Sequence, residues 1–191
     1  GHNNDAESQL INAGGNNTDF GGAARFKATV DSLRDEAAGV GYNFMLVTSG
    51  DNYLPGPEFN ASLDRDPALP YYDAILIDSL RYDALCIGNH DFDFGPEVLA
   101  NLISDASVNM PTFLSANLDF SGEPDLDALV AAGRIAPSKI IERNGRKIGI
   151  VGLTTPNLPF ISSPGDVVVD PNVATIAQAQ VDALTDSGAN I

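Results

Sequence analysis

The chain has 191 residues, of which 43% are hydrophobic and 19% charged, a composition typical of a folded globular domain rather than a disordered chain. Its formal net charge is -16 and it holds only 10 Lys and Arg, which argues against a nucleic-acid polymer as partner, because phosphate backbones are bound by basic patches. No stretch reaches the roughly 20 apolar residues of a membrane span, and no signal segment is visible.

The spacing of apolar residues predicts alternating helices and short strands in the first half of the chain. We expect an amphipathic helix over 22–38, a strand over 43–48, and a loop around Pro55 to Pro57. A second helix is expected over 71–82, followed by an apolar strand over 83–87. This strand holds the only cysteine of the chain, which we interpret as a small core residue.

The second half continues the alternation. Pro96 is suited to a first helical turn, which predicts a helix over 96–105, and a strand follows over 112–117. Asn144-Gly145 predicts the tight turn of a hairpin within 140–152, and a last helix is expected over 171–186. Strands that alternate with helices predict an α/β domain, with a layered sheet flanked by helices.

Both ends of the chain look cut. Ile191 stands where the pattern calls for a new strand, just after Gly188, and Gly1 to Asp5 enters a polar cluster without a preceding strand. A natural α/β domain would normally place such a cluster at the end of a strand. We therefore expect this chain to be part of a longer protein.

The run over 88–95 carries the strongest functional signal. It places an amide, an imidazole and two carboxylates within five positions, directly after the apolar stretch 84–87. Such a cluster at the carboxyl end of a strand is how α/β enzymes present reactive groups. Alone, the run is more typical of a polar turn between a strand and a helix than of a reactive site.

Two other segments carry similar groups. They are Asp5-Ala6-Glu7 near the start and Gly50-Asp51-Asn52 after a strand. If the strands are parallel neighbours, their carboxyl ends converge on one crevice, where Asp5, Glu7, Asp51 and Asn89 would offer oxygen ligands. Carboxylates packed together favour a bound cation, because their mutual repulsion is otherwise unfavourable.

A pair of divalent metal ions at such a crevice would polarise a phosphoryl group and generate a hydroxide nucleophile at neutral pH. Asp51 is the candidate to bridge the two metals, since a carboxylate has an oxygen for each. His90 would donate to the leaving or a non-bridging oxygen, and Asp93 would orient the imidazole and raise its proton affinity.

Gly50-Asp51 and Gly88 to Asp91 resemble two signature blocks of the calcineurin-like metallophosphoesterases. Longer stretches resemble one branch of that superfamily, the secreted 5′-nucleotidases and related 2′,3′-cyclic-nucleotide phosphodiesterases. These stretches run in order over nearly the whole chain, at 2–5, 50–57, 89–93, 114–118 and 151–156.

The resemblance implies an α/β/β/α sandwich, here incomplete, in which a two-metal centre cleaves phosphate esters. Asp5 would bind the first metal, Asp51 would bridge, Asn89 would bind the second metal, and His90 and Asp93 match the family's catalytic pair. Residues 1–191 would form the N-terminal portion of the catalytic domain, without the remainder and the C-terminal substrate domain. The resemblance also implies a periplasmic, secreted or cell-surface location.

Alternatives remain for several of these residues. Asp5 could be a turn residue in a frayed end, and Asp93 could only cap the helix that begins at Pro96. The family's first motif is usually Asp-x-His, and Glu7 in the histidine position would favour Mn, Mg, Ca or Fe over Zn if it ligates. Glu7 could instead point to solvent, and we interpret His2 as a packing residue rather than a ligand.

The family's later histidine motifs have no counterpart, since the chain holds only two histidines. We therefore expect hydrolysis of nucleotides or similar small phosphate esters by the longer protein, with weak or no activity in this piece alone. One alternative is a non-catalytic scaffold or binding module derived from this fold. Another is a one-metal sugar or lipid phosphatase of the same superfamily.

Overall fold

The computed structural model describes residues 1–14, 16, 20–105 and 110–191. Its centre is a parallel sheet of five short strands in the spatial order β1-β2-β3-β4-β6. The strands are bounded as follows: β1 His2–Asn3, β2 Val47–Thr48, β3 Ala84–Cys86, β4 Phe113–Leu114 and β6 Ile135–Ala136. Each strand pairs in parallel with the next one, so all five carboxyl ends lie along the same edge of the sheet.

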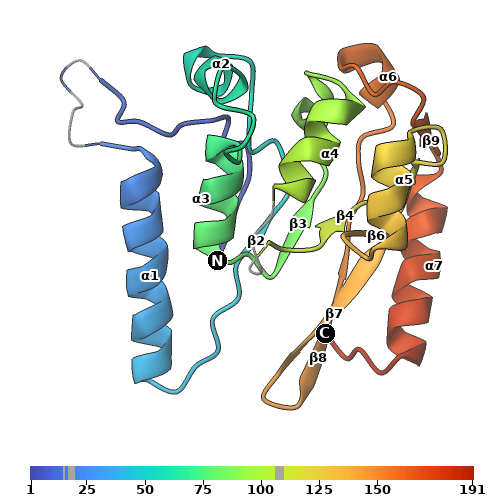
Figure 1. Ribbon diagram of the computed structural model, residues 1–191. Coiled ribbons are helices and arrows are strands. Elements are labelled where there is room, and N and C mark those ends of the chain that lie inside the picture. Colours follow the sequence, from blue (N-terminus) through green and yellow to red (C-terminus); the bar gives the residue numbers. More distant parts are fainter. Residues whose placement is uncertain (15, 17–19, 106–109) are drawn as a thin grey trace.

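Helices stand in one row beside this sheet (Figure 1). Neighbouring contacts run from α1 to α3, from α3 to α4 and from α4 to α5, while the short α2 packs on α3. The strands of the sheet follow one another in chain order, and crossovers of the usual right hand then place all the connecting helices on a single face. The bounds are α1 Ala23–Gly39, α2 Pro57–Leu63, α3 Tyr72–Leu80, α4 Pro96–Ser104 and α5 Pro124–Ala131.

An antiparallel hairpin and a helix form the last part of the chain. The hairpin joins β7 (Ser138–Arg143) to β8 (Arg146–Val151), and α7 (Val173–Asp186) packs on both of its strands. Asn144 and Gly145 both have positive φ values, 48° and 71°, as a two-residue hairpin turn requires. The remaining elements are short: a 3-10 turn η1 (His90–Phe92), α6 (Leu158–Ile161), and the pair β5 (Leu118–Asp119) and β9 (Val168–Val169).

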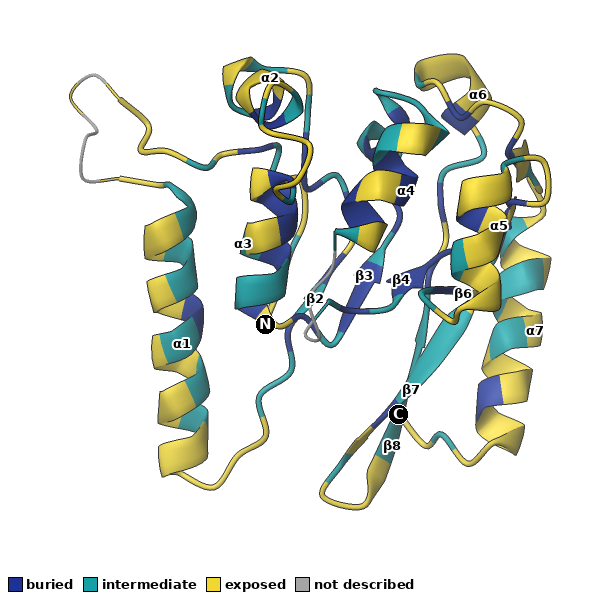
Figure 2. Ribbon diagram, viewed as in Figure 1, coloured by how far each residue is buried: buried dark blue, intermediate teal, exposed yellow. Residues whose placement is uncertain are grey.

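The core lies between the parallel sheet and the row of helices (Figure 2). It includes four large side chains with at most 1% exposure, namely Tyr53, Phe59, Phe92 and Phe113. The rings of Tyr53 and Phe59 stack with centroids 4.6 Å apart, which fastens the segment after β2 onto α2. By contrast α1 and α7 are largely exposed, with Val30 and Leu184 as their only residues described as buried.

The α/β architecture predicted from the sequence is confirmed, as are the hairpin and the helices expected at 22–38, 71–82, 96–105 and 171–186. The strands are shorter than predicted, because their flanking residues leave the ladder to build loops. The loop expected at Pro55 to Pro57 leads directly into α2, with Pro57 in its first turn. The expectation that no strand precedes Asp5 was wrong, since β1 pairs with β2 just upstream.

Candidate active site

The ends of β1, β2 and β3 carry the residues singled out from the sequence. Beyond the two-residue ladder of β1 and β2, their segments stay paired through three backbone bonds. The amides of Asp5, Glu7 and Ser8 donate to the carbonyls of Gly50, Asp51 and Asn52 at 3.3, 3.1 and 3.0 Å. The two acidic segments therefore run side by side out of the sheet.

The backbone at this edge adopts a conformation that is uncommon for residues with side chains. Asp5, Glu7, Ser8 and Asp51 all have positive φ values, between 49° and 55°. Only Arg81 and Asn144 share this property among the other non-glycine residues that the structure describes. Strained backbone of this kind clusters at functional sites, where the surrounding structure holds it in place.

Two glycines let the loops after β2 and β3 approach closely. A Cβ atom on Gly88 would lie 2.2 Å from Oδ1 of Asp51, and one on Gly50 would lie 2.5 Å from the amide nitrogen of Gly88. Both distances are far inside van der Waals contact. The close approach brings Oδ1 of Asp51 to 2.7 Å from the backbone N–H of His90, which donates to it.

Asp51 is half-buried and lies near a second carboxylate. Burial raises the pKa of Asp51, and the backbone N–H of His90 opposes this shift, while the neighbouring Asp5 adds to it. The structure thus brings Asp5 and Asp51 together, as the sequence predicted. Glu7 lies within electrostatic range of the same centre, because its charge helps to raise the pKa of His90.

Asp91 has a structural role that the sequence did not reveal. Its side chain is 1% exposed, and its Oδ2 accepts from the backbone amides of Gly88 at 2.7 Å and Asp51 at 3.4 Å. The hydroxyl of Tyr53 donates to the backbone carbonyl of Asp91. Asp91 therefore holds the loops after β2 and β3 together from behind. Burial raises the pKa of Asp91 to about 7.

This raised pKa has a measurable effect on stability. The ordinary pKa of an aspartate in an unfolded chain is about 3.9, so between about pH 4 and pH 7 the folded state holds the Asp91 proton more tightly. The contribution of Asp91 to stability is therefore fully present below pH 4 and is lost as the pH rises to 7. We expect wild type to lose up to about 1.4 kcal/mol per pH unit relative to D91N in this window.

Chemical denaturation of both proteins in EDTA, from about pH 4 to about pH 10, measures this difference. Above pH 8 the gap between the two curves should be constant. Parallel curves for wild type and D91N over the whole range would contradict the assignment.

His90 forms a pair with Asp93, as expected. Its Nδ1 lies 2.6 Å from Oδ2 of Asp93, and the two side chains are 34% and 14% exposed. Partial burial lowers the pKa of His90, but the hydrogen bond and charge of Asp93 outweigh this effect and raise the pKa overall. Helix α4 begins after Gly95 without a side-chain cap, so Asp93 does not cap it.

Ser162, immediately after α6, adds a third hydrogen-bonding side chain to the His90–Asp93 pair. Its hydroxyl donates to Oδ1 of Asp93 at 2.8 Å, so both oxygens of the Asp93 carboxylate are engaged. Sequence reasoning missed Ser162, because it lies 69 residues from Asp93 in an ordinary-looking Ser-Ser-Pro stretch.

A buried polar network, formed by Asn117 and Thr154, contacts Ile87 just after the end of β3. Asn117 and Thr154 exchange two hydrogen bonds through the amide side chain of Asn117 and the backbone of Thr154, at 2.9 and 2.8 Å. The Thr154 hydroxyl donates to the carbonyl of Ile87 at 2.7 Å, just before Gly88. The stretches 114–118 and 151–156, which looked like family motifs, thus act together as a support.

Several of these side chains could hold a metal. Asp5 and Asp51 present two neighbouring carboxylates, and Asn89, half-buried at the start of η1, adds an amide oxygen at the same edge. Within the described ranges, no group of three or more His, Cys, Asp and Glu side chains is arranged to hold a metal ion. His2 lies in β1 with an exposed side chain.

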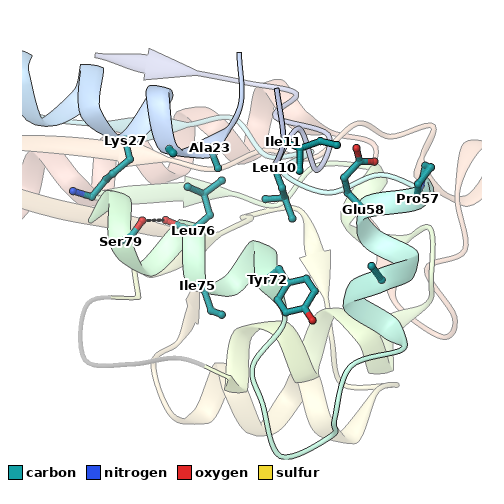
Figure 3. Close-up of a pocket in the computed structure, with 12 residues that line it drawn as sticks. Leu10, Ile11, Ala23, Lys27, Pro57, Glu58, Tyr72, Ile75, Leu76 and Ser79 are labelled. Carbon is teal, nitrogen blue, oxygen red and sulfur yellow. Dashed lines mark hydrogen bonds between the residues drawn. The ribbon is translucent and has the colours of Figure 1, made fainter. Parts of the chain in front are cut away.

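A cavity away from these residues lies among the N-terminal segment, α1, α2 and α3 (Figure 3). It measures about 700 Å³ and is lined mainly by apolar side chains such as Leu10, Ile75 and Leu76. Its single lysine, Lys27, forms an ion pair with Asp31. Apolar walls of this kind do not suit a phosphate group, so the acidic strand ends remain the candidate active site.

No helix in the described ranges is long and apolar enough to span a membrane. No protein-family model matches the chain. Its sequence is 34% identical over 173 residues to a 5′-nucleotidase from Diplobatis ommata, an alignment that covers 88% of this chain and 27% of the relative. The chain thus spans about a quarter of the length of this curated relative.

The chain is also similar in fold to solved structures of phosphoesterases. The crystal structure of a 5′-nucleotidase precursor from Thermus thermophilus is 32% identical, with a TM-score of 0.78, over 99% of this chain and 34% of that one. The calcineurin-like phosphoesterase YfkN from Bacillus subtilis shares the fold, with a TM-score of 0.73 at 22% identity, over 100% of this chain and 58% of that one.

Proposed function

We propose that the protein containing this chain is a phosphoesterase that hydrolyses nucleotides or similar small phosphate esters, because the chain is homologous to 5′-nucleotidases and has the fold of a calcineurin-like phosphoesterase. The homology supports hydrolysis of a phosphate ester. The choice of a nucleotide as substrate rests on the names of the relatives. We also propose that residues 1–191 form the N-terminal portion of a catalytic domain.

The residues at the strand ends fit divalent metal ions. Asp5 and Asp51 repel each other unless a cation lies between them, and Asn89 adds a neutral oxygen of the kind that hard metals bind. We propose Asp5 and Asp51 as ligands of a first metal and Asp51 and Asn89 as ligands of a second, with Glu7 as a further candidate. Two such ions would polarise the phosphoryl group and supply a nucleophile at neutral pH.

His90 is the proposed proton donor. Because Asp93 accepts a hydrogen bond from the Nδ1–H group, Nε2 is left to face the substrate, and the raised pKa keeps a larger share of the ring protonated near neutral pH. In hydrolysis the bond from phosphorus to the ester oxygen breaks while a bond from phosphorus to a water oxygen forms. The His90 proton passes to the departing ester oxygen.

The pairing of Asp5 with Asp51 beside His90 is the observation that supports this proposal most strongly. The test is to purify the protein that contains this chain, remove metals with EDTA, and assay 5′-AMP, 2′,3′-cyclic AMP and an aryl phosphate before and after adding Mn²⁺, Mg²⁺ or Zn²⁺. We expect activity on at least one ester that returns with metal. Retained fold with no metal binding and no turnover would instead favour a scaffold or binding module.

Ser162 offers a graded test of the His90–Asp93 pair. S162A removes one hydrogen bond from Asp93 but leaves His90 in place, so we expect kcat to fall by a factor of about 10, the effect of one charge-assisted hydrogen bond. S162T should restore most of the loss, because it keeps the hydroxyl. A matched control is S121A, since Ser121 is exposed and its side chain interacts with Asp119 instead. Equal kcat values for S162A and S121A would rule out this role.

We further propose that the protein works in the periplasm, at the cell surface or outside the cell. The family resemblance supports this location, and the net charge of -16 is compatible with it. Fractionation of the source cells, with activity assayed in each fraction, tests it directly.

A further inference from the structure

Two buried polar side chains near Asp51 carry atoms that make no hydrogen bond of standard geometry within the described residues. Asp73, in the first turn of α3, is 2% exposed, and neither of its carboxylate oxygens makes a hydrogen bond of standard geometry within the described residues, although the Ser8 hydroxyl interacts with the carboxylate. Asn52, next to Asp51, is 5% exposed, and its Nδ2 makes no such bond there either. Buried groups of this kind normally find a partner, because leaving them unpaired costs about 1–3 kcal/mol each.

Both side chains line the same small cavity. Its other walls come from Ala6, Tyr82 and the apolar residues Phe26, Leu76, Ile77 and Leu80. The cavity gives the centre of a water molecule about 10 Å³ of room, which is close to the minimum that one water needs. It is too small for any organic ligand.

The hydrogen bonds around Asn52 show which of its side-chain atoms is left without a partner. The Thr48 hydroxyl donates to Oδ1 of Asn52 at 3.4 Å, and the same hydroxyl accepts from the backbone N–H of Gly50 at 3.4 Å. Oδ1 is therefore engaged on the β2 side, and the donor Nδ2 is the group left over. A donor on one wall and a carboxylate on the other call for a molecule that can both accept and donate.

The charge of Asp73 strengthens this requirement. Burial raises the pKa of Asp73 to about 6, although the nearby Ser8 hydroxyl opposes the shift, so the carboxylate is mostly ionised at pH 7. Its position in the first turn of α3 gives some compensation, because free N–H groups there favour a negative charge. An ionised buried carboxylate still needs hydrogen-bond donors of its own.

We propose that this cavity is a binding site for a single structural water molecule, which accepts a hydrogen bond from Nδ2 of Asn52 and donates to the carboxylate of Asp73. A bound cation is the less suitable occupant, since the Nδ2–H group of Asn52 would point its positive end at it. The water links α3 to the segment that carries Asp51. It thereby continues the chain of hydrogen bonds that runs from Gly50 through Thr48 and Asn52.

A crystal structure of the chain at about 1.5 Å resolution or better tests the site directly. We expect one density peak at 2.7–3.2 Å from Nδ2 of Asn52 and from an oxygen of Asp73. A peak with five or more oxygen neighbours at about 2.3–2.6 Å would identify a cation and overturn the proposal. It would also be overturned if Asn52 and Asp73 bonded each other directly with no peak between them.

A double-mutant cycle tests the same link in solution. N52A and D73L each remove one end of the bridge, so their combined effect on the unfolding equilibrium constant should be smaller than the product of the single effects, by at least threefold. The control cycle pairs N52A with L126A, because Leu126 is buried in α5 at the far end of the row of helices (Figure 1). There the two effects should multiply within about twofold.

Equal coupling in the two cycles would contradict a bridge between Asn52 and Asp73. Because the readout is stability and not turnover, this outcome is independent of whether the proposed phosphoesterase activity is found.

Discussion

H90A should lower kcat/KM of the protein that contains this chain, measured on its best phosphate ester, by a factor of about 10² to 10⁴. This range is the usual contribution of a positioned proton donor. The structure supports it because Asp93 holds His90 at 2.6 Å, raises its pKa and leaves one ring nitrogen to face the substrate. D93N should cause a smaller loss, since the ring remains but its orientation and charge are no longer supported.

The chain supplies its own control for this experiment. His2 is the only other histidine, and it lies exposed in β1. H2A should therefore change kcat/KM by less than about twofold, and far-ultraviolet circular dichroism should show that both variants are folded. If H90A kept wild-type turnover, or if H2A lost as much as H90A, the assigned role of His90 would be wrong.

The second large effect is expected at Gly88, where the loops after β2 and β3 meet. The Cβ atom of G88A would lie 2.2 Å from Oδ1 of Asp51 and 2.8 Å from its backbone nitrogen, so the two loops must separate. Overpacking of this kind costs about 1–3 kcal/mol of stability. Displacement of Asp51 by about 1 Å should also reduce turnover by about 10²-fold. Denaturant titration and the phosphate-ester assay measure the two effects.

Gly39 provides the matched substitution. It is the last residue of α1, and a Cβ atom there would meet nothing within 4 Å. G39A should leave activity unchanged and stability equal or slightly higher, because alanine favours the helix more than glycine does. Equal losses in G39A and G88A would show that the close approach at Gly88 has no special importance.

Much of the fold could be predicted from the sequence, since strongly periodic apolar segments such as 71–82 and 171–186 form helices of nearly the expected length. The weaker predictions concern short elements. Strands of two residues, such as β5 and β9, are too short to show an alternating pattern of apolar residues. Their pairing also cannot be read from the sequence, because the two partners lie far apart in the chain. Likewise α2 was missed because it begins at Pro57, the last residue of a Pro-Gly-Pro sequence that is typical of loops.

The candidate site was predictable where its residues follow strands. The structure brings Asp5, Asp51 and His90 together because parallel strands end at one edge, and this rule needs only the strand assignments. Ser162 and Asp73 could not be found in this way. Their partners lie in other segments, and nothing in their own neighbourhoods distinguishes them from ordinary serine and aspartate residues.

During synthesis, the five strands of the parallel sheet leave the ribosome in the order in which they lie side by side. Each new strand can therefore dock on a neighbour that is already formed, and no strand has to insert between two others. Asp5, Asp51, Asn89 and His90 all belong to the first three strands and the loops that follow them, so they can assemble while the later half of the chain is still being made. Ser162 arrives last, and its bond to Asp93 joins α6 to the completed strand ends.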